Sequence, residues 1–442
     1  MVETVSPILY LPIELSEREL DSKLLLGLHG VQHDFQIVIG QQWLLFHNID
    51  RLAPGIVILK GLNNIEAGRH AKAARAGHRV VGLEEEALGV IDEKHLIMGA
   101  NRDLVLNLDL LIAHGDAYRD VIVDWLPEMA GKVVVCGNPR VDLLRRELRA
   151  IYDGEVARIK ERFDGFVLFN TNFSWCNSAW GDKKNVYMIN VRGGYFDVHN
   201  TADSRRVRAR VAADETEFAA YIRLINEAAT SFPNRTFIVR PHPGETIDGW
   251  RDLTKHLRNV EVIRDGSANY WTLASDLMLH RSCTTGLEAL LLDRRTVSYC
   301  PFPHFYYDEL IVNQVLDVVS EHDTMMGIIG DSDGWFAGRG ERARLMAERL
   351  AHHLTGLTGP LASQRMIDVM RPMVSDGGCG GDPRLDGFEP TMERNEIFKN
   401  RFTVDEAKVV ERIKALSHAL PTLPQPEVTT IGDSLFLIRP AA

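Results

Sequence analysis

Two motifs in the second half of the chain carry the residue types that handle phosphate groups. The first, Arg240-Pro-His-Pro-Gly-Glu245, directly follows an apolar run of strand character. Its prolines fix their own φ angles and restrict the residues before them, so His242 is held in an extended conformation. There it can donate a hydrogen bond or positive charge to a departing phosphate oxygen, and Arg240 can add a planar cation. The alternative is a structural loop in which His242 caps a backbone carbonyl.

The second motif, Ser282-Cys-Thr-Thr-Gly-Leu-Glu288, stands between an apolar run and a helical pattern. Hydroxyl groups and unpaired backbone N–H groups at a helix start form an anion site, which the helix dipole strengthens. We therefore expect Ser282, Thr284 and Thr285 to bind phosphate, and Glu288 to reach a ribose hydroxyl. Ordinary capping by one of the threonines is the alternative, and Glu288 can equally face solvent.

A proton acceptor must come from elsewhere, and three acidic positions in the first half are candidates. Glu85 lies within Glu84-Glu85-Glu86 after a strand-like run, Asp116 follows His114-Gly115, and Glu14 closes the first apolar run. Glu85 and Asp116 are the preferred catalytic carboxylates. Acidic residues also favour the first turn of a helix, so helix stabilisation or capping is the alternative for both.

Short apolar runs alternate with helical patterns along both halves of the chain. In the first half these runs cover residues 8–14, 35–40, 55–59, 80–83, 110–114 and 133–136. In the second half they cover residues 166–169, 236–239, 260–263, 277–279 and 297–300. Strands separated by helix-length segments indicate a parallel sheet, and runs that are apolar throughout indicate sheets covered on both faces.

The predicted fold is therefore α/β, with two Rossmann-like parallel-sheet domains. We expect an N-terminal domain over 1–155, a second domain over 165–375 that carries both phosphate motifs, and a linker with a terminal helix and tail over 376–442. Residues 170–210, rich in Asn, Gly, Trp and charge, are predicted to form a long insertion. Later helices, over 341–354 and 405–418, are available to cross back to the first domain. This layout, with the domains facing across a cleft, is typical of GT-B glycosyltransferases and of nucleotide-sugar 2-epimerases.

Composition excludes several classes of protein. The chain has 442 residues, 45% of them hydrophobic and 25% charged, and a formal net charge of -11. Nucleic-acid binding has no support from this charge, and the basic cluster Arg205, Arg206, Arg208 and Arg210 is interpreted as a solvated face. No signal peptide or membrane-spanning run is predicted, so we expect a cytoplasmic protein, with peripheral contact at the inner face of the membrane left open.

Neither metal sites nor disulfide bonds are expected. Five scattered cysteines, at 136, 176, 283, 300 and 379, lack metal-ligand spacing and indicate reduced thiols. Asp331-Ser-Asp333 has the Asp-x-Asp form of a metal-binding signature, but its Gly-rich surroundings favour a surface turn. We therefore predict no metal and no cofactor beyond a nucleotide-sugar co-substrate.

Four segments resemble a known family, the bacterial surface carbohydrate (surface polysaccharide) biosynthesis proteins. They are Leu-Pro-Ile-Glu-Leu-Ser-Glu-Arg-Glu-Leu and its continuation over 11–26, Val-Cys-Gly-Asn-Pro-Arg-Val-Asp-Leu-Leu over 135–144, Val-Leu-Phe-Asn-Thr-Asn-Phe over 167–173, and the Arg-Pro-His-Pro element. The resemblance runs in order over about the first 300 residues.

The resemblance extends to GT-B enzymes with a His-Pro element and a Ser/Thr-rich helix start, such as bacterial sialyltransferases, Kdo transferases of capsule assembly and CDP-glycerol glycerophosphotransferases. It implies that His242 contacts the donor phosphate, that Ser282, Thr284 and Thr285 bind it, and that CMP-activated ulosonic acids are the favoured donors. The Asp-Asp/Glu-Gly element of sialyltransferases is missing from the first domain, so the base and the choice between inversion and retention stay open.

The function that the resemblance implies is transfer of a sugar, favoured as Kdo or another ulosonic acid, from a nucleotide sugar to a glycan or glycolipid acceptor. The domain over 165–375 is then the nucleotide-sugar-binding domain, and the domain over 1–155 is the acceptor-side domain. Three alternatives remain: a UDP-sugar 2-epimerase, a CDP-polyol phosphotransferase, and a non-catalytic factor of polysaccharide assembly.

Overall fold

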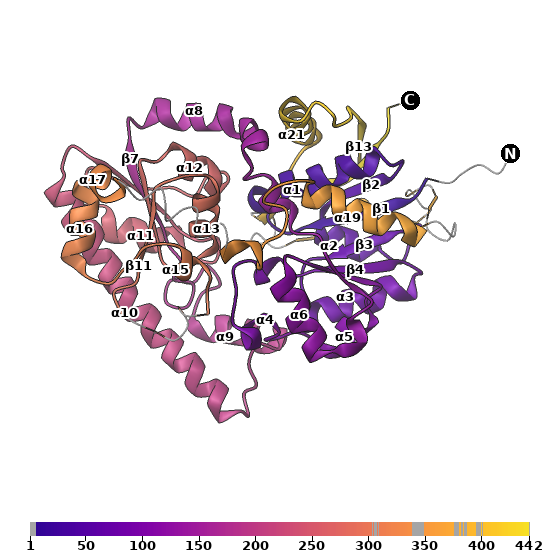
Figure 1. The fold of residues 1–442 in the computed structure, drawn as a ribbon, viewed down its shortest axis with the longest axis horizontal. Coiled ribbons are helices and arrows are strands. Elements are labelled where there is room, and N and C mark those ends of the chain that lie inside the picture. Colours follow the sequence, from indigo (N-terminus) through magenta and orange to yellow (C-terminus); the bar gives the residue numbers. More distant parts are fainter. Residues whose placement is uncertain are drawn as a thin grey trace. The chain divides into compact units, whose positions relative to one another are not determined.

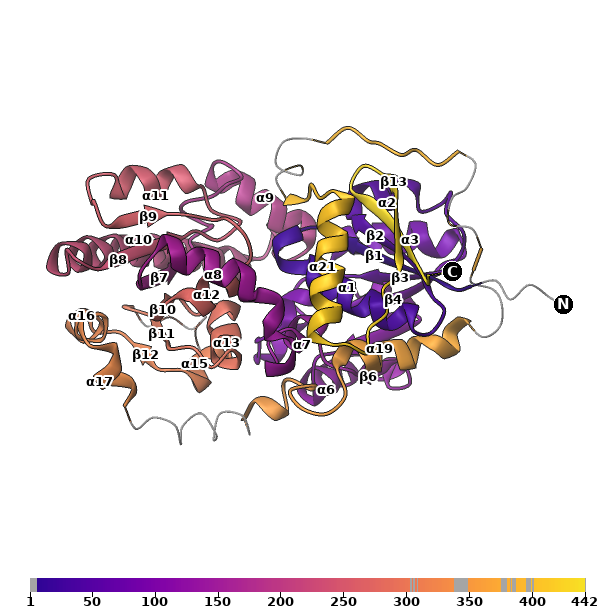
Figure 2. The same ribbon diagram turned by 90° about the horizontal axis from the view of Figure 1, so that it is seen from above.

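The chain forms two compact α/β units (Figures 1 and 2). The computed structural model describes residues 6–302, 304, 307, 309–337, 349–374, 380–381, 383, 387–394, 399 and 401–441. Unit 1 comprises residues 1–88, 99–151 and 351–442, and unit 2 comprises residues 89–98 and 152–350. The predicted class, with two domains built on parallel sheets, is confirmed.

Unit 1 is organised on an eight-stranded sheet in the order β13-β14-β2-β1-β3-β4-β5-β6. The strands are β1 (Ile8–Ile13), β2 (Gln36–Gln41), β3 (Ile56–Leu59), β4 (Arg79–Leu83), β5 (Leu110–Ala113), β6 (Val133–Val135), β13 (Glu427–Gly432) and β14 (Leu435–Arg439). Strands β1 to β6 pair in parallel, whereas the β13–β14 hairpin adds an antiparallel edge beside β2. The inner strands β1, β2 and β3 are buried along their whole length, as expected of a sheet covered on both faces.

The helices of unit 1 lie between these strands and in the returning C-terminal chain. They are α1 (Ser16–Val31), α2 (Gln42–Asn48), α3 (Asn64–Arg75), α5 (Arg102–Asn107), α6 (Asp116–Trp125), α7 (Pro139–Asp142), α19 (Ala362–Met370) and α21 (Glu406–Ala419), with short 3₁₀ turns at Glu85–Ala87, Pro127–Met129, Arg146–Tyr152 and Arg371–Val374. Figure 2 shows α21 lying along α1.

Unit 2 has a wholly parallel sheet in the order β12-β11-β10-β7-β8-β9. Its strands are β7 (Phe166–Asn170), β8 (Thr236–Arg240), β9 (Val260–Val262), β10 (Leu277–His280), β11 (Thr296–Tyr299) and β12 (Val318–Val319). Its helices are α4 (Glu93–Leu96), α8 (Asp153–Arg162), α9 (Lys183–Gly193), α10 (Thr201–Ser231), α11 (Ile247–Thr254), α12 (Ala268–Ala274), α13 (Thr284–Leu291), α15 (Val312–Val315), α16 (His322–Gly330) and α17 (Ser332–Phe336).

Three expectations about the elements need correction. The predicted insertion over 170–210 contains α9 and the first turns of α10, which has 31 residues and begins at Thr201. The predicted tail forms the β13–β14 hairpin, whose backbone completes the sheet of unit 1. Residues 351–442 accordingly belong to unit 1, as the expected crossing back implies, and are not a separate linker region. Most of the helix expected over 341–354 and of the loop expected over 377–386 lies outside the described residues.

One buried carboxylate attaches the returning chain to unit 1. Asp142, at the end of α7, is fully buried and accepts hydrogen bonds from the N–H groups of Ala362 (2.8 Å) and Ser363 (2.9 Å) and from the Ser363 hydroxyl (2.8 Å). These groups lie at the start of α19, where helix N–H groups have no partner within the helix. The carboxylate therefore caps a helix that is distant in sequence.

We predict that Asp142→Ala lowers the free energy of unfolding by about 2–4 kcal/mol, because it leaves two buried N–H groups unsatisfied. Urea unfolding followed by circular dichroism measures the loss. Asp405→Ala is the matched control, because Asp405 caps α21 through the Lys408 N–H in an exposed setting (2.8 Å), where a cap contributes about 1 kcal/mol. Equal losses in the two variants would contradict the assignment.

Candidate functional site

Three neighbouring strands of unit 2 end in one row, and both phosphate motifs follow them. Arg240 of β8 pairs with Asn170 of β7, and Asn170 pairs with His280 of β10. Adjacent strands lie about 4.8 Å apart, so the segments after Arg240 and His280 leave the same edge about 10 Å from each other. The carboxyl edge of a parallel sheet is where α/β proteins bind ligands.

His242 lies in the exposed part of the first motif. The N–H of Gly244 donates to His242 Nδ1 at 3.0 Å, and the N–H of His242 donates to Glu245 Oε1 at 2.9 Å. Because Nδ1 accepts a hydrogen bond, the neutral ring carries its proton on Nε2. The loop thus fixes one tautomer, in which Nε2 carries the proton of an exposed side chain.

Glu245 closes this loop from inside the protein. Its side chain is fully buried and accepts from the Thr171 hydroxyl (2.7 Å), the Trp250 indole N–H (2.9 Å) and the His242 N–H. Burial raises the pKa of Glu245. From the sequence we predict no role for Glu245. The feature that could have indicated one is an acidic residue in a Pro-rich turn, five positions before a tryptophan.

Arg240 is turned away from the exposed part of the motif. It is buried, and its guanidinium donates to the carbonyl of Gly266 in the turn before α12. Arg264 meanwhile donates to the carbonyl of Glu245 at 2.8 Å. The two arginines brace the loop that carries His242, and phosphate binding by Arg240 stays a prediction.

The second motif divides between an inward and an outward part. Ser282 is buried with φ +41°, and its Oγ lies 3.0 Å from Cys300 Sγ and accepts from Asn313 Nδ2 at 2.9 Å. This network holds the turn and places the hydroxyl in the interior. Thr284 and Thr285, in the first turn of α13, and Glu288, one turn later, are partly exposed. The threonines and the helix N–H groups are thus the part of the motif suited to an anion.

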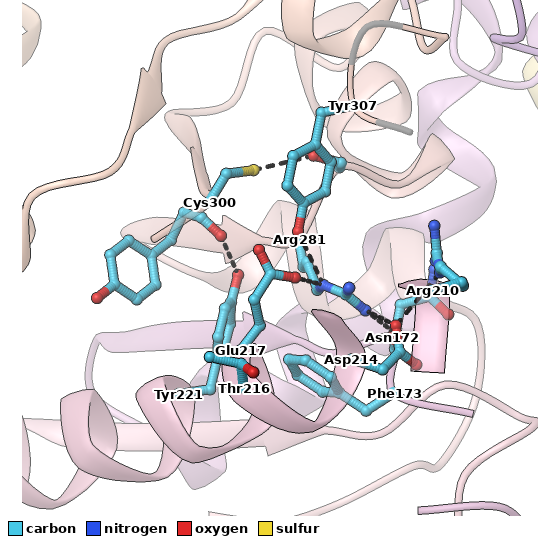
Figure 3. Close-up of polar contacts among 12 residues, drawn as sticks. Asn172, Phe173, Arg210, Asp214, Thr216, Glu217, Tyr221, Arg281, Cys300 and Tyr307 are labelled. Atoms are coloured by element: carbon cyan, nitrogen blue, oxygen red, sulfur yellow. Dashed lines mark hydrogen bonds and ion pairs between the residues drawn. The ribbon is translucent and has the colours of Figure 1, made fainter. Parts of the chain in front are cut away.

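A buried ionic cluster fixes the turn between β10 and α13 (Figure 3). Arg281 is almost fully buried, forms ion pairs with Asp214 (2.7 Å) and Glu217 of α10, and donates to the Asn172 carbonyl at 2.9 Å. Its guanidinium also lies 4.8 Å from the centre of the Phe173 ring. Arg281 therefore joins the exits of β7 and β10 to α10, a role that we did not predict from the sequence.

His280 and Gly286 contact each other beneath this turn. Burial lowers the pKa of His280 to about 3, so the ring is neutral, and its Nδ1 accepts from the Cys283 N–H at 3.4 Å. A Cβ atom on Gly286 would lie 2.3 Å from His280 Nε2. Only glycine allows the first turn of α13 to approach the end of β10 this closely.

In unit 1, Glu85 lies in a buried charge cluster. Its carboxylate lies 3.3 Å from Lys23 Nζ and 3.8 Å from Arg140 Nη1, and it accepts from Asn138 Nδ2 at 3.1 Å. Burial alone would raise the pKa of Glu85, but Lys23, Arg140 and Asn138 outweigh it and hold the pKa at about 2. A carboxylate of such low pKa is a weak base, so this environment does not favour a catalytic role for Glu85.

The other two acidic candidates are also paired. Asp116 opens α6, is partly exposed, and forms an ion pair with Arg119 at 2.5 Å. Glu14 is paired with Lys60 and Arg401. Asp116 is therefore the more accessible of the two preferred carboxylates, and its catalytic role stays a prediction.

The expectations about metals and thiols concern other parts of the chain. Asp331 accepts from the Gly334 N–H at 2.8 Å and caps α17, while Asp333 pairs with Arg295. Across the described residues no group of three or more His, Cys, Asp and Glu side chains is arranged to hold a metal ion. Cys136, Cys176, Cys283 and Cys300 are free thiols, and Cys379 lies outside the described residues.

We predict that Gly286→Ala lowers the free energy of unfolding by about 1–3 kcal/mol, because its methyl group collides with a buried imidazole. In a double-mutant cycle with His280→Ala, the combined variant should be more stable than the sum of the two single losses. Gly327→Ala in α16 is the control, because its Cβ would meet nothing within 4 Å. Strict additivity in the cycle would argue against the contact.

The Glu85 cluster predicts a specific pH dependence of stability. Its folded pKa of about 2 lies below the ordinary 4.5, so the stabilisation is complete above about pH 4.5 and is lost as the pH falls towards 2. At 1.36 kcal/mol per pKa unit the contribution is about 3 kcal/mol. Glu85→Gln should lose it at neutral pH and show a flatter fall in unfolding free energy on acidification, measured by denaturant titration at several pH values. Asp116→Asn is the control, and a Glu85→Gln profile that overlays the parent would contradict the prediction.

Comparison with known proteins gives matches only among solved structures, since no family model and no curated protein matches the chain. One match is UDP-GlcNAc 2-epimerase from Neisseria meningitidis bound to UDP-GlcNAc, with 15% identity, coverage of 82% of this chain and 99% of that chain, and TM-score 0.48. Another is the wall teichoic acid polymerase TagF, with 12% identity, coverage of 84% and 89%, and TM-score 0.47. A third is Anabaena Alr3699/HepE in complex with UDP-glucose, with 11% identity, coverage of 83% and 99%, and TM-score 0.43. At such identities and scores, no activity carries over to this chain.

Proposed function

We propose that this protein is a glycosyltransferase of bacterial surface polysaccharide synthesis, and that unit 2 binds its nucleotide-sugar donor. The observation that carries the proposal is the row Arg240–Asn170–His280, which brings the exposed His242 and the start of α13 to one edge of one sheet. The segments that carry His242 and the start of α13 leave one sheet edge about 10 Å apart, so the imidazole and the helix N–H groups can both reach a phosphate group that lies between them.

In the proposed reaction, the bond between the anomeric carbon and the phosphate oxygen breaks, and the nucleotide leaves with the electron pair. His242 Nε2–H donates to the phosphate oxygen on which negative charge develops. The N–H groups at the start of α13, with the hydroxyls of Thr284 and Thr285, stabilise the same phosphate. Both contacts strengthen as the charge grows, which is how they lower the barrier.

The acceptor hydroxyl attacks the anomeric carbon and gives up its proton. In an inverting reaction a carboxylate takes that proton. Asp116 is the preferred candidate, because neighbouring cations hold the pKa of Glu85 at about 2 and make it a weak base. The family resemblance favours a CMP-activated ulosonic acid such as Kdo as the donor. The geometry described above supports binding of a nucleotide phosphate.

We predict that His242→Ala reduces turnover by on the order of a hundredfold, because the leaving phosphate loses its proton donor. The assay follows nucleotide release from CMP-, UDP- and CDP-activated donors, with and without an added surface-glycan fraction as acceptor. His256→Ala is the control, because His256 is an exposed histidine of unit 2 bonded to Asn226 (2.7 Å).

The outcomes separate the alternatives. Release that depends on the acceptor supports transfer, whereas epimerised UDP-sugar without acceptor supports a 2-epimerase. Transfer of a polyol phosphate from a CDP-donor supports the phosphotransferase, and no turnover with any donor favours an assembly factor. Near-normal turnover of His242→Ala would overturn the assignment of His242.

A further inference from the structure

The outward face of α9 combines aliphatic and basic side chains. Asn185, Met188, Ile189 and Arg192 are spaced i, i+3, i+4 and i+7, which places them on one side of the helix, and all four are exposed. Met188 is 37% exposed and Ile189 is 38% exposed, while Val186, outside this stripe, is buried. The face that α9 presents to solvent is therefore not the polar face typical of a surface helix.

The segment that contains α9 is attached to the first half of α10 near both of its ends. Lys183, at the start of α9, pairs with Glu215, and the N–H of Asp197, after α9, donates to Asp203 Oδ2 at 3.0 Å. In Figure 1 the Thr201 end of α10 extends away from the sheet of unit 2. Val198, 44% exposed, lies in the connection between the two helices.

The same segment is basic in an acidic protein. Residues 183–210 contain seven Lys or Arg and two Asp residues, a formal charge of +5, in a chain whose net charge is -11. Arg206 and Arg210 pair with Glu309 and Asp214. Arg192, Arg205 and Arg208 are exposed and form no ion pair within the part of the chain that the structure describes.

The exposed aliphatic side chains favour an anionic bilayer over a nucleic acid as the partner of this basic segment. Met188, Ile189 and Val198 are three of the seven large exposed hydrophobic residues among those described, and they fall within eleven residues. A polyanion such as nucleic acid is bound by cations and by aromatic stacking, so it leaves aliphatic chains in water. An anionic bilayer accommodates both groups, because its phosphates attract the arginines and its acyl boundary accepts the aliphatic chains.

We propose that α9, its connection to α10 and the first turns of α10 form a docking surface for an anionic lipid bilayer. Met188, Ile189 and Val198 enter the acyl boundary, and Arg192, Arg205 and Arg208 contact lipid phosphates. No described helix is long and apolar enough to cross a bilayer. The proposed attachment is peripheral and reversible, and it does not depend on the activity proposed for unit 2.

Co-sedimentation of the full chain with lipid vesicles tests the proposal. We expect binding to phosphatidylcholine vesicles that contain phosphatidylglycerol, little binding to phosphatidylcholine alone, and release at about 1 M salt, where the screening length falls to about 3 Å. Met188→Asp with Ile189→Asp should reduce partitioning at least about tenfold, because two aliphatic contacts become repulsive charges. Arg205→Glu with Arg208→Glu should reduce it as well.

Ile65→Asp is the matched control, because Ile65 is 49% exposed but lies in unit 1. It should bind vesicles as the parent does, and thermal unfolding of all variants should confirm that each is folded. Absence of binding to anionic vesicles would overturn the proposal, as would Met188→Asp/Ile189→Asp or Arg205→Glu/Arg208→Glu variants that bind as tightly as the parent. Retention on heparin without vesicle binding would also overturn it, in favour of a polyanion partner.

Discussion

The candidate site depends on one buried carboxylate. A carboxylate removed from water is costly unless donors satisfy it, and Glu245 obtains them from the end of β7, from α11 and from the backbone of His242. The hydrogen bonds to Glu245 fix the loop that carries His242. The loop in turn fixes the tautomer of the His242 ring. Arg281 fixes the turn before α13 in the same way, because its buried charge is balanced by Asp214 and Glu217. The exposed groups of the site are therefore held in place by buried polar groups behind them.

Much of the fold follows from apolar periodicity. The strand-like runs of both halves form strands. A short run that is apolar throughout is typical of a strand in a parallel sheet that helices cover on both faces. The β13–β14 hairpin was missed because prolines dominate the sequence before it, while β14 is stabilised by pairing with β2, almost four hundred residues away. The start of α10 was missed for a related reason: its first turns are rich in arginine and mostly exposed, so they show no apolar stripe.

The candidate site was predictable as a set of segments but not as a set of side-chain directions. Parallel register brings the motifs at 240–245 and 282–288 to one edge, and the sequence shows both. Whether Arg240 and Ser282 point outward depends on Gly266 and Asn313, which the local pattern does not reveal. Glu85 is similar, because Lys23 and Arg140, the cations that hold its pKa near 2, come from α1 and α7.

The proposed function requires that a nucleotide phosphate binds at His242 Nε2. Nitrogen-15 NMR of histidine-labelled protein, with the His242 signal assigned from its loss in His242→Ala, observes this atom during titration with CMP, CDP and UDP. We expect a protonated Nε2 and an accepting Nδ1 in the free protein, and a saturable shift of the Nε2 signal with at least one nucleotide. Saturable nucleotide binding that leaves the His242 signals unmoved would contradict it.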